Sequence, residues 1–474
     1  MFGWLKSRRR KKRGNADEKR RKQRRLEARA RTKVRSGKAG PEKGKARRSH
    51  GAEKTKRRPI APPSAAIAAP PAKPPAPARA SPPATVIASQ PPPVTQPKPP
   101  PAVEPRPKVP GVAVYGMFAA PIGLGEAARR GVEALRRAGI PLSTHSTDVR
   151  QVPFRVPFPA DDPDAPVYDT AILHFHPGPT LQRIARPLSD RRKIGVWHWE
   201  LPVFPPQWAN DALAIDEIWA PSRFIADLMR AAFNKPVHLV PHPALVVPID
   251  AADARAALGL PRSRRIILTA FDFRSYWARK NPEAVLRAFV DAFSQGGESP
   301  LLVVKYHRDN KDQDREQVER IRATPNVLVI DRTMTQEEMR MLYAASDAFV
   351  SLHRSEGVGL NLLDMMGLGR VCVATGFSGN LDFMSADNSI LIPWTMRAVG
   401  RGEYLHGDGQ WWAEPDHDAA VEAMRFIGTA SDSALAALGE RARIDTDRDF
   451  SFERVGAIAR AAWIGEKSAD GGSP

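Results

Sequence analysis

The sequence predicts an α/β protein with two doubly wound, Rossmann-like domains that face a cleft, preceded by a disordered, basic and proline-rich N-terminal tail. From Val112 onward, short apolar runs alternate with amphipathic helical runs, which is typical of parallel sheets covered by helices on both faces. Pro248, an alanine-rich stretch and a Leu-Gly-Leu-Pro sequence indicate a seam at 245–260. The charge and the proline content change abruptly at residue 110, which separates the tail from the folded part.

The tail carries the positive charge of the chain. The 474 residues have a net charge of +20, but residues 1–110 hold 31 Lys and Arg against 6 Asp and Glu, a net charge of +25. Residues 111–474 hold 41 Lys and Arg against 46 Asp and Glu, a net charge of −5. Residues 1–60 have too few apolar side chains for a core, and residues 61–110 hold 19 prolines, which predicts an extended linker.

Three functions stay open for the basic tail. It is either a solvated polycation without a specific partner, a tether to an anionic membrane surface, or a nucleic-acid binder. Phe2, Trp4 and Leu5 would add an apolar anchor to a tether. Nucleic-acid binding is disfavoured because no aromatic residues are interleaved through the basic run for base stacking. We therefore expect a cytoplasmic protein, peripheral on the inner face of the cell membrane if the tail is a tether.

Several classes of protein are excluded by composition. Cys372 is the only cysteine, so an intrachain disulfide framework and a cysteine-based zinc site are impossible. No run approaches the roughly 18 apolar residues of a membrane span, and residues 1–10 lack the apolar segment of a secretory signal. Beyond the tail at 1–60 and the linker at 61–110, we expect Rossmann-like domains at 111–247 and 248–450, and a C-terminal helix and tail at 451–474.

The individual elements follow from the alternating pattern. The expected strands are 112–116, 170–175, 194–198, 218–220, 238–241, 266–271, 301–306, 327–331, 348–353, 371–375 and 390–393. The expected helices include 125–138, 224–233, 282–293, 314–323, 336–346 and 360–368. Ligands of such folds bind at the carboxyl ends of the strands, so motifs that follow strands are the candidate site.

Two motifs suit phosphate groups. Gly123 and Gly125 follow the first strand and open a helix, whose N-terminal N–H groups attract anions; a purely structural turn is the alternative. After the strand 266–271, Arg274 and Lys280 flank the start of the next helix, and a guanidinium and an ammonium together suit a diphosphate. The alternative for these cations is ordinary surface charge.

A third motif adds carboxylates to a glycine loop. Glu356 follows the strand 348–353, Gly359, Leu360 and Asn361 open a helix, and Asp364 lies little more than a turn into it. The helix N-terminus again suits a phosphate, and the two carboxylates can accept hydrogen bonds from sugar hydroxyls. The alternative for Glu356 is a favourable charge at a helix N-terminus.

Histidines end two strands of the first domain. His174 and His176 end the strand 170–175, and alternation predicts one face for both. His198 ends the next strand, and Glu200 lies nearby as a weaker acid/base candidate. A histidine at a strand end is more often structural than catalytic.

Together these motifs resemble the retaining GT-B glycosyltransferases of the large family-4 (group 1) type. Two further matches are the glycine loop at 376–384 and the run 412–416, and the segments 195–200 and 216–222 are similar to a bacterial subset. The resemblance covers roughly residues 112–463. It implies that 111–247 binds the acceptor and 248–450 binds the nucleotide sugar.

The resemblance also implies residue roles. Arg274 and Lys280 would hold the donor diphosphate and stabilise the leaving group, and Glu356 would contact the donor sugar. Asp364 would bind the ribose, although the family usually has Glu there and Asp has a shorter reach. Gly123, Gly125, Gly359, Leu360 and Asn361 would line the donor phosphates, and His176, ranked before His198, would lie near the reacting sugar.

The expected activity is transfer of a sugar, typically a hexose, from a nucleoside-diphosphate sugar to a glycan or lipid-linked acceptor in bacterial polysaccharide biosynthesis. The resemblance implies retention of configuration, no cofactor and no metal requirement, because Arg274 and Lys280 take the place of a cation. Two alternatives stay open: a nucleotide-sugar epimerase of the same fold, and a non-catalytic scaffold that binds polyanions or membranes and keeps a vestigial sugar-nucleotide site. Glycosidase chemistry fits less well, since it needs two opposed carboxylates.

Overall fold

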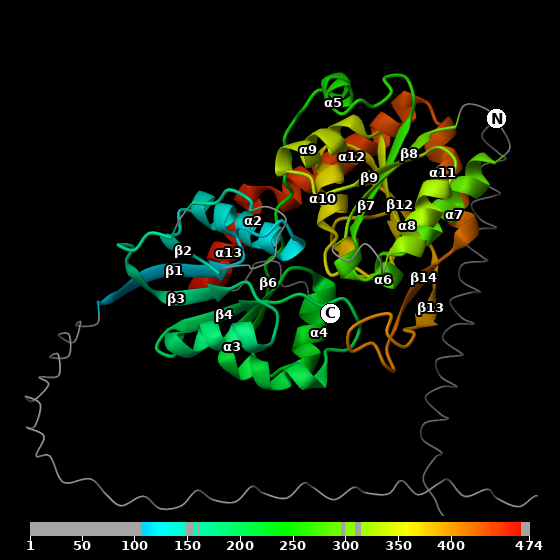
Figure 1. Ribbon diagram of the computed structural model, residues 1–474. Coiled ribbons are helices and arrows are strands. Elements are labelled where there is room, and N and C mark those ends of the chain that lie inside the picture. The colour runs from blue at the N-terminus through cyan, green and yellow to red at the C-terminus, as the bar shows by residue number, and fades with distance from the viewer. Residues whose placement is uncertain (1–105, 148–154, 160, 295–298, 309–313, 466–474) are drawn as a thin grey trace, which may run out of the picture. The chain divides into compact units, whose positions relative to one another are not determined.

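The computed structural model describes residues 106–147, 155–159, 161–294, 299–308 and 314–465. The predicted basic tail and linker therefore lie outside the described residues, apart from the last few residues before 111. Figure 1 shows the two sheets and the helices around them.

The first sheet has six parallel strands in the order β2-β1-β3-β4-β5-β6. These strands are β1 (Lys108–Gly116), β2 (Leu142–Ser146), β3 (Val167–Leu173), β4 (Arg192–Val196), β5 (Glu217–Ala220) and β6 (Val237–Leu239). The helices in this part of the chain are α2 (Gly123–Arg137), α3 (Pro179–Ala185) and α4 (Arg223–Ala232), with 3₁₀ turns at Arg186–Leu188 and Pro206–Ala214. The predicted strands are present with small shifts of their ends, and the polar strand β2 is an addition.

The second sheet has six parallel strands in the order β12-β11-β10-β7-β8-β9. They are β7 (Ile266–Asp272), β8 (Leu301–His307), β9 (Val327–Asp331), β10 (Ala348–Ser351), β11 (Val371–Thr375) and β12 (Ile390–Ile392). Its helices are α5 (Ala251–Ala257), α6 (Trp277–Lys280), α7 (Pro282–Phe293), α8 (Arg315–Ala323), α9 (Gln336–Ala345), α10 (Leu360–Gly367), α11 (His417–Thr429) and α12 (Asp432–Phe450). Two 3₁₀ turns lie at Phe273–Ser275 and Gly379–Asp382.

Each sheet is apolar on both faces. Along β7, Ile267 and Phe271 pack into one core while Ile266 and Leu268 pack into another, as expected when successive side chains point to opposite faces. The first sheet is likewise covered on both sides by two further cores. Two parallel sheets, each buried on both faces, confirm the predicted fold class.

Capping residues define the helix starts. Ser222 caps α4 and Asp250 caps α5 through their side-chain oxygens. Thr335 and Glu338 form a reciprocal capping box at α9. These local signals agree with the predicted helix positions, since the predicted helices at 224–233 and 336–346 begin within a residue of α4 and α9.

Two elements extend beyond the alternating pattern. β13 (Trp394–Ala398) and β14 (Trp411–Pro415) form an antiparallel hairpin. α13 (Phe452–Ile464), red in Figure 1, packs against α2 of the first sheet, where a Cβ atom on Gly456 would lie 2.5 Å from the Ala134 carbonyl oxygen. None of the helices in the described ranges is long and apolar enough to cross a bilayer.

Candidate active site

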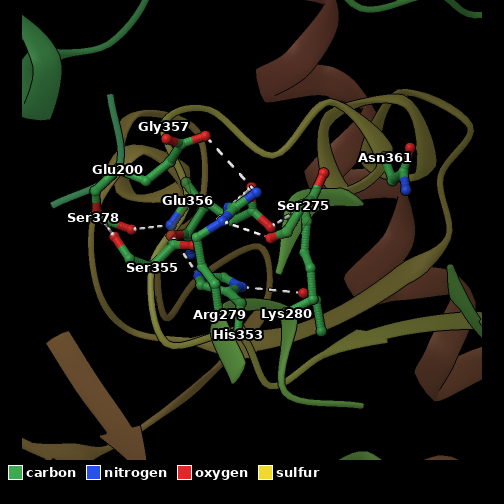
Figure 2. A network of polar contacts seen from close by, with 12 residues as sticks. Glu200, Ser275, Arg279, Lys280, His353, Ser355, Glu356, Gly357, Asn361 and Ser378 are labelled. Carbon is green, nitrogen blue, oxygen red and sulfur yellow. Dashed lines mark hydrogen bonds and ion pairs between the residues drawn. The ribbon is translucent and has the colours of Figure 1, made fainter. Parts of the chain in front are cut away.

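The candidate site forms where three loops of the second sheet meet. β11, β10 and β7 are neighbours, and parallel strands bring the loops at their carboxyl ends to one edge. The loop after β7 carries Arg279 and Lys280, the loop after β10 carries Glu356, and the loop after β11 carries Ser378. Figure 2 shows the polar contacts that join these residues.

Lys280 and Arg279 both hold the Glu356 carboxylate. The Lys280 ammonium donates to Oε1, and Arg279 Nη1 donates to Oε2 at 3.2 Å. Arg279 is anchored further by the carbonyl oxygens of Ser355 at 3.0 Å and Ser275 at 3.1 Å. The two cations differ in exposure, since 20% of the Lys280 side chain reaches solvent against 5% of Arg279. The cluster therefore has one partly exposed cationic side chain, that of Lys280, and one nearly buried side chain, that of Arg279.

The cations keep Glu356 ionised. Burial by itself would raise the pKa of this carboxyl, but Lys280 and Arg279 outweigh burial and lower the pKa to about 2. Burial is the largest influence on Lys280 and lowers the pKa of its ammonium despite the attraction of Glu356. A carboxylate that stays ionised accepts hydrogen bonds only, which suits hydroxyl groups of a sugar.

The backbone around α6 is strained. α6 is a single turn flanked by two non-glycine residues with positive φ, Tyr276 at 65° and Asn281 at 49°. The Asn281 amide donates to the Leu352 carbonyl at 2.9 Å, and the Arg354 N–H donates to the Arg279 carbonyl at 2.8 Å. Asparagine adopts the left-handed conformation of Asn281 readily, whereas the conformation of Tyr276, with a ψ of 117°, costs about 1–3 kcal/mol and is of a kind that concentrates at functional sites. The loop after β10 thus holds both cations in place against this strain.

The loop after β11 covers the backbone beside Glu356. Ser378 Oγ accepts the Glu356 N–H at 2.8 Å, and the Gly379 N–H donates to the Glu356 carbonyl at 2.9 Å. A Cβ atom on Gly379 would lie 1.9 Å from the Gly357 carbonyl oxygen, so this approach requires glycine. The glycine loop expected at 376–384 therefore lies at the site and fixes the position of Glu356.

α10 begins at Leu360, four residues after Glu356 and at the end of the same loop. Gly359 precedes the helix with a φ of 92°, a conformation that favours glycine. Gly359, Leu360 and Asn361 are partly exposed, whereas residues 362–367 are buried. The first N–H groups of a helix lack intrahelical partners and bind anions. These three predicted residues are therefore placed where a phosphate could reach them.

Arg274 contacts a different carboxylate from Lys280. It lies in the turn Phe273–Ser275 and pairs with Asp272, with Nη2 to Oδ2 at 2.6 Å. Its side chain is exposed, and Arg279 is the arginine that shares Glu356 with Lys280. The single turn α6 brings the two adjacent cations to one carboxylate. The diphosphate contact of Arg274 stays a prediction.

Asp364 is enclosed by an arginine from α2. Its oxygens accept from Arg130 Nη1 at 2.7 Å and Nη2 at 2.6 Å, and Oδ1 also accepts the Leu245 N–H at 2.8 Å. The Arg130 side chain is 5% exposed and that of Asp364 is 4% exposed. Three of roughly four lone-pair positions on the carboxylate are thus taken. The ribose contact of Asp364 stays a prediction, and a ribose hydroxyl would have to use the remaining position or displace a partner.

The glycine turn before α2 leads to the same ion-pair network. Gly123 is exposed at the first residue of α2, and Gly125 is buried in its first turn. Glu126 accepts from Arg130 Nε at 2.9 Å and from the Gln336 amide at 2.8 Å. Burial opposes ionisation of Glu126, but its arginine neighbours lower its pKa to about 2. The phosphate contact of Gly123 and Gly125 stays a prediction.

The two histidines after β3 have different surroundings. β3 ends at Leu173, so both histidines follow the strand, and their expected common face stays a prediction. His174 is buried, which lowers its pKa to about 4, whereas His176 is exposed. The His176 ring lies 6.1 Å from that of His198, whose Nε2 is 2.8 Å from Nε2 of the buried His242. His176 and His198 are thus neighbours, and His176 is the accessible one.

Glu200 joins the cluster from the first domain. The Tyr404 hydroxyl donates to Oε2 at 2.5 Å, and Oε1 lies 3.7 Å from Arg279 Nη2. The Ser355 hydroxyl donates to the backbone carbonyl of Glu200. Because Tyr404 lies between β13 and β14, the hairpin that the sequence analysis missed also contributes to the site.

Some site residues have only a faint signal in the sequence. Arg130 shares the buried face of α2 with Ala127 and Ala134, at helical spacing, and a cation on an apolar face indicates a buried ion pair. Tyr404 and His242 carry no such signal, because their partners are distant in sequence. Within the described ranges, no three His, Cys, Asp or Glu side chains group in a way that could hold a metal ion.

The second sheet carries a family match. Residues 265–402 match the model of the family described as glycosyl transferases group 1. This segment runs from the start of β7 into the connection between β13 and β14, and it includes Lys280, Glu356 and Ser378. By sequence, no curated protein is a significant match.

Solved structures share the arrangement of both sheets. Sucrose-phosphate synthase from Thermosynechococcus elongatus superposes with a TM-score of 0.55 at 16% identity, over 75% of this chain and 99% of that chain. The fold is GT-B-like. A glycosyltransferase from Rickettsia africae superposes with a TM-score of 0.53 at 10% identity, over 76% of this chain and 100% of that chain. Anabaena Alr3699/HepE in complex with UDP and glucose superposes with a TM-score of 0.51 at 12% identity, over 75% of this chain and 99% of that chain. At these identities the likeness concerns the GT-B-like fold, while the link to glycosyl transferases group 1 comes from residues 265–402.

Proposed function

We propose that this GT-B-like protein is a glycosyltransferase that moves a sugar from a nucleoside-diphosphate sugar to a glycan or lipid-linked acceptor. The observation that carries the proposal is the Lys280–Glu356 pair beside the N-terminus of α10, inside the segment that matches glycosyl transferases group 1. An ammonium and free helix N–H groups suit a diphosphate. An ionised carboxylate next to them suits the hydroxyl groups of the attached sugar.

The proposed chemistry depends on stabilising the leaving group. Negative charge builds on the diphosphate as the glycosidic bond breaks, and preorganised donors aimed at that charge are usually the largest catalytic contribution. Lys280 and the N–H groups of residues 359–361 are the donors, with Arg274 as a second cation from its exposed turn. His176 is the group we place next to the reacting sugar. With these cations in position we propose transfer that is retaining and independent of a metal or other cofactor.

The donor is proposed from a structural neighbour. Anabaena Alr3699/HepE is solved with UDP and glucose, so uridine-diphosphate hexoses are the first donors to test, and hexosyl transfer in bacterial polysaccharide biosynthesis is the setting we propose. A panel of nucleotide sugars should contain one that raises the melting temperature and is hydrolysed slowly without acceptor. A panel in which no compound does either would reject the proposal and favour the scaffold alternative. Conversion of the donor to its epimer, without transfer, would favour the epimerase.

The basic tail is proposed to bind an anionic membrane surface, which would place the enzyme on the inner face of the cell membrane. The net charge of +25 supplies electrostatic attraction, and Phe2, Trp4 and Leu5 supply a shallow apolar anchor. Two weak attractions of this kind together suit reversible membrane binding. Removal of residues 1–60 should release the protein from vesicles of phosphatidylserine and phosphatidylcholine while leaving transfer to a soluble acceptor unchanged. Vesicle binding that survives the truncation would reject the tether.

A further inference from the structure

We infer that Arg279 is a positioning residue which neutralises Glu356 from the buried side, so that the charge of Lys280 is left for the diphosphate of the donor. This inference rests on the proposed function and assigns a role to a residue for which the family resemblance gave none. It explains why two cations share one carboxylate while only one of the two side chains is partly exposed.

The contacts of Arg279 are directed into the protein. Its Nε donates to the Ser275 carbonyl at 3.1 Å, and its Nη1 donates both to the Ser355 carbonyl at 3.0 Å and to Glu356 Oε2 at 3.2 Å. Its Nη2 lies 3.7 Å from Glu200 Oε1, and the guanidinium carbon is 5.9 Å from the centre of the Tyr404 ring. With 4% of the residue exposed, Arg279 offers a ligand little surface. It therefore acts on a ligand through its neighbours.

The formal charges of the cluster show why Arg279 would affect the binding of a diphosphate. Glu200 and Glu356 carry two negative charges, and Arg279 and Lys280 carry two positive charges, so the cluster is neutral. Without Arg279 the cluster would have a net charge of −1, and Lys280 would be the sole cation on Glu356. A diphosphate would then meet an anionic site, and like charges in a partly buried position repel strongly.

The surrounding structure holds Arg279 in this role. Tyr404 donates to the other oxygen of Glu200, which keeps Oε1 turned toward Arg279. The positive φ values of Tyr276 and Asn281 bracket the α6 turn that aims Arg279 inward and leaves Lys280 partly exposed. The strained backbone of Tyr276, at the start of this four-residue helix, is of a kind that concentrates at functional sites.

The test is nucleotide binding by four full-length proteins: wild type, Arg279→Met, Glu356→Gln and the double variant Arg279→Met/Glu356→Gln. Isothermal titration with uridine diphosphate, and separately with inorganic pyrophosphate, gives the dissociation constants, and circular dichroism melting confirms that each variant is folded. We expect Arg279→Met to weaken binding about tenfold or more, and the double variant to regain most of that loss because Lys280 no longer faces an unshared carboxylate. A fifth protein, Arg279→Lys, keeps the charge and should lose less affinity than Arg279→Met.

The outcomes separate the inference from the proposed function. Equal loss in the single and double variants would overturn the inference and point to direct phosphate binding by Arg279. Unchanged binding in Arg279→Met would also overturn it. If Arg279→Met does not fold, a double variant that folds and binds as tightly as wild type supports the inference, and one that folds and binds weakly rejects it. Failure of the wild type to bind either probe would overturn the proposed function, and the inference with it.

Discussion

Two buried carboxylates eight residues apart, Glu356 and Asp364, are used in opposite ways. Glu356 is shared by two cations, one of which is partly exposed, and lies next to an accessible helix N-terminus. Asp364 is held by Arg130, and both side chains of that pair are closed to solvent. The difference teaches that two buried ion pairs eight residues apart can differ in how a ligand would reach them. Beside Glu356 the Lys280 side chain is partly exposed, whereas a ribose hydroxyl at Asp364 would have to use the one remaining position or displace a partner.

The largest expected effect is on stability at the closed pair. Arg130→Met should leave Asp364 buried without a counter-charge and lower the free energy of unfolding by about 3–5 kcal/mol. The double variant Arg130→Met/Asp364→Asn, which removes the stranded charge but still accepts the Leu245 N–H, should regain most of the loss. Urea unfolding measures both. A double variant as unstable as the single one would mean that the packing of Arg130 or its pair with Glu126, rather than its pair with Asp364, accounts for the loss.

The second largest effect is expected on activity, when Lys280 is removed from its pair with Glu356. Lys280→Ala should lower the rate of sugar transfer by about 10²–10³-fold, the usual loss when one donor to developing charge is removed. Its melting temperature should change little, since Arg279 still neutralises Glu356. The control is Lys108→Ala. Lys108 lies on β1 and pairs with Asp190, so this variant should transfer sugar at the wild-type rate. Wild-type turnover by Lys280→Ala would contradict the assignment of the site.

The pH dependence of stability should also single out Glu356. Its folded pKa of about 2 lies below the ordinary value of 4.5, so its ionised form stabilises the fold above pH 4.5, and this contribution is lost as the pH falls toward 2. The free energy of unfolding of the wild type, relative to Glu356→Gln, should therefore fall by about 3 kcal/mol between pH 5 and pH 2. Chemical unfolding across that range measures it. A difference independent of pH would show that Glu356 is not ionised in the fold.

A smaller loss of stability is expected at Ser222, where the first domain contacts the loop that carries Glu356. Ser222 Oγ caps α4 by accepting the Ile225 N–H at 3.3 Å, and its hydroxyl donates to the Gly357 carbonyl at 2.7 Å. Ser222→Ala should lower stability by about 1–2 kcal/mol, from the cap and the lost hydrogen bond together. Ser431→Ala, which removes the cap of α12 and an exposed hydroxyl contact with Ser433, should lower it by about 1 kcal/mol and leave transfer unchanged. Equal effects on transfer in the two variants would show that the Ser222 contact does not influence the site.

The sequence was sufficient for most of the fold because local pattern and tertiary structure agree in the sheets. The strand ending at Phe271 and the helix from Pro282 are apolar runs with clear ends, and both were predicted within a residue. β2 was missed because Leu-Ser-Thr-His-Ser has one apolar residue, and its strand conformation depends on pairing with β1. The β13–β14 hairpin was missed for a similar reason, since it is antiparallel and lies outside the alternating pattern.

The motifs of the site could be predicted from the sequence, but the side chains that pair with the motif residues could not. Lys280, Glu356 and the glycine loop follow neighbouring strands, so topology alone brings them together. Arg130 and Asp364 are 234 residues apart in sequence, and no local rule connects a helix near the start of one domain to a helix in the other. Which of Arg274 and Arg279 faces Glu356 depends on the geometry of the single turn α6, which residue spacing does not specify.

The path of the chain at α13 has a consequence for how the first core is completed. The polypeptide passes from the first sheet to the second between β6 and α5, and it returns at Ser451, where α12 ends and α13 begins to pack on α2. One core of the first sheet therefore includes Ala459 and Ala462 from the end of the described chain. Expression of residues 111–247 alone would uncover the apolar surface that these two alanines now cover.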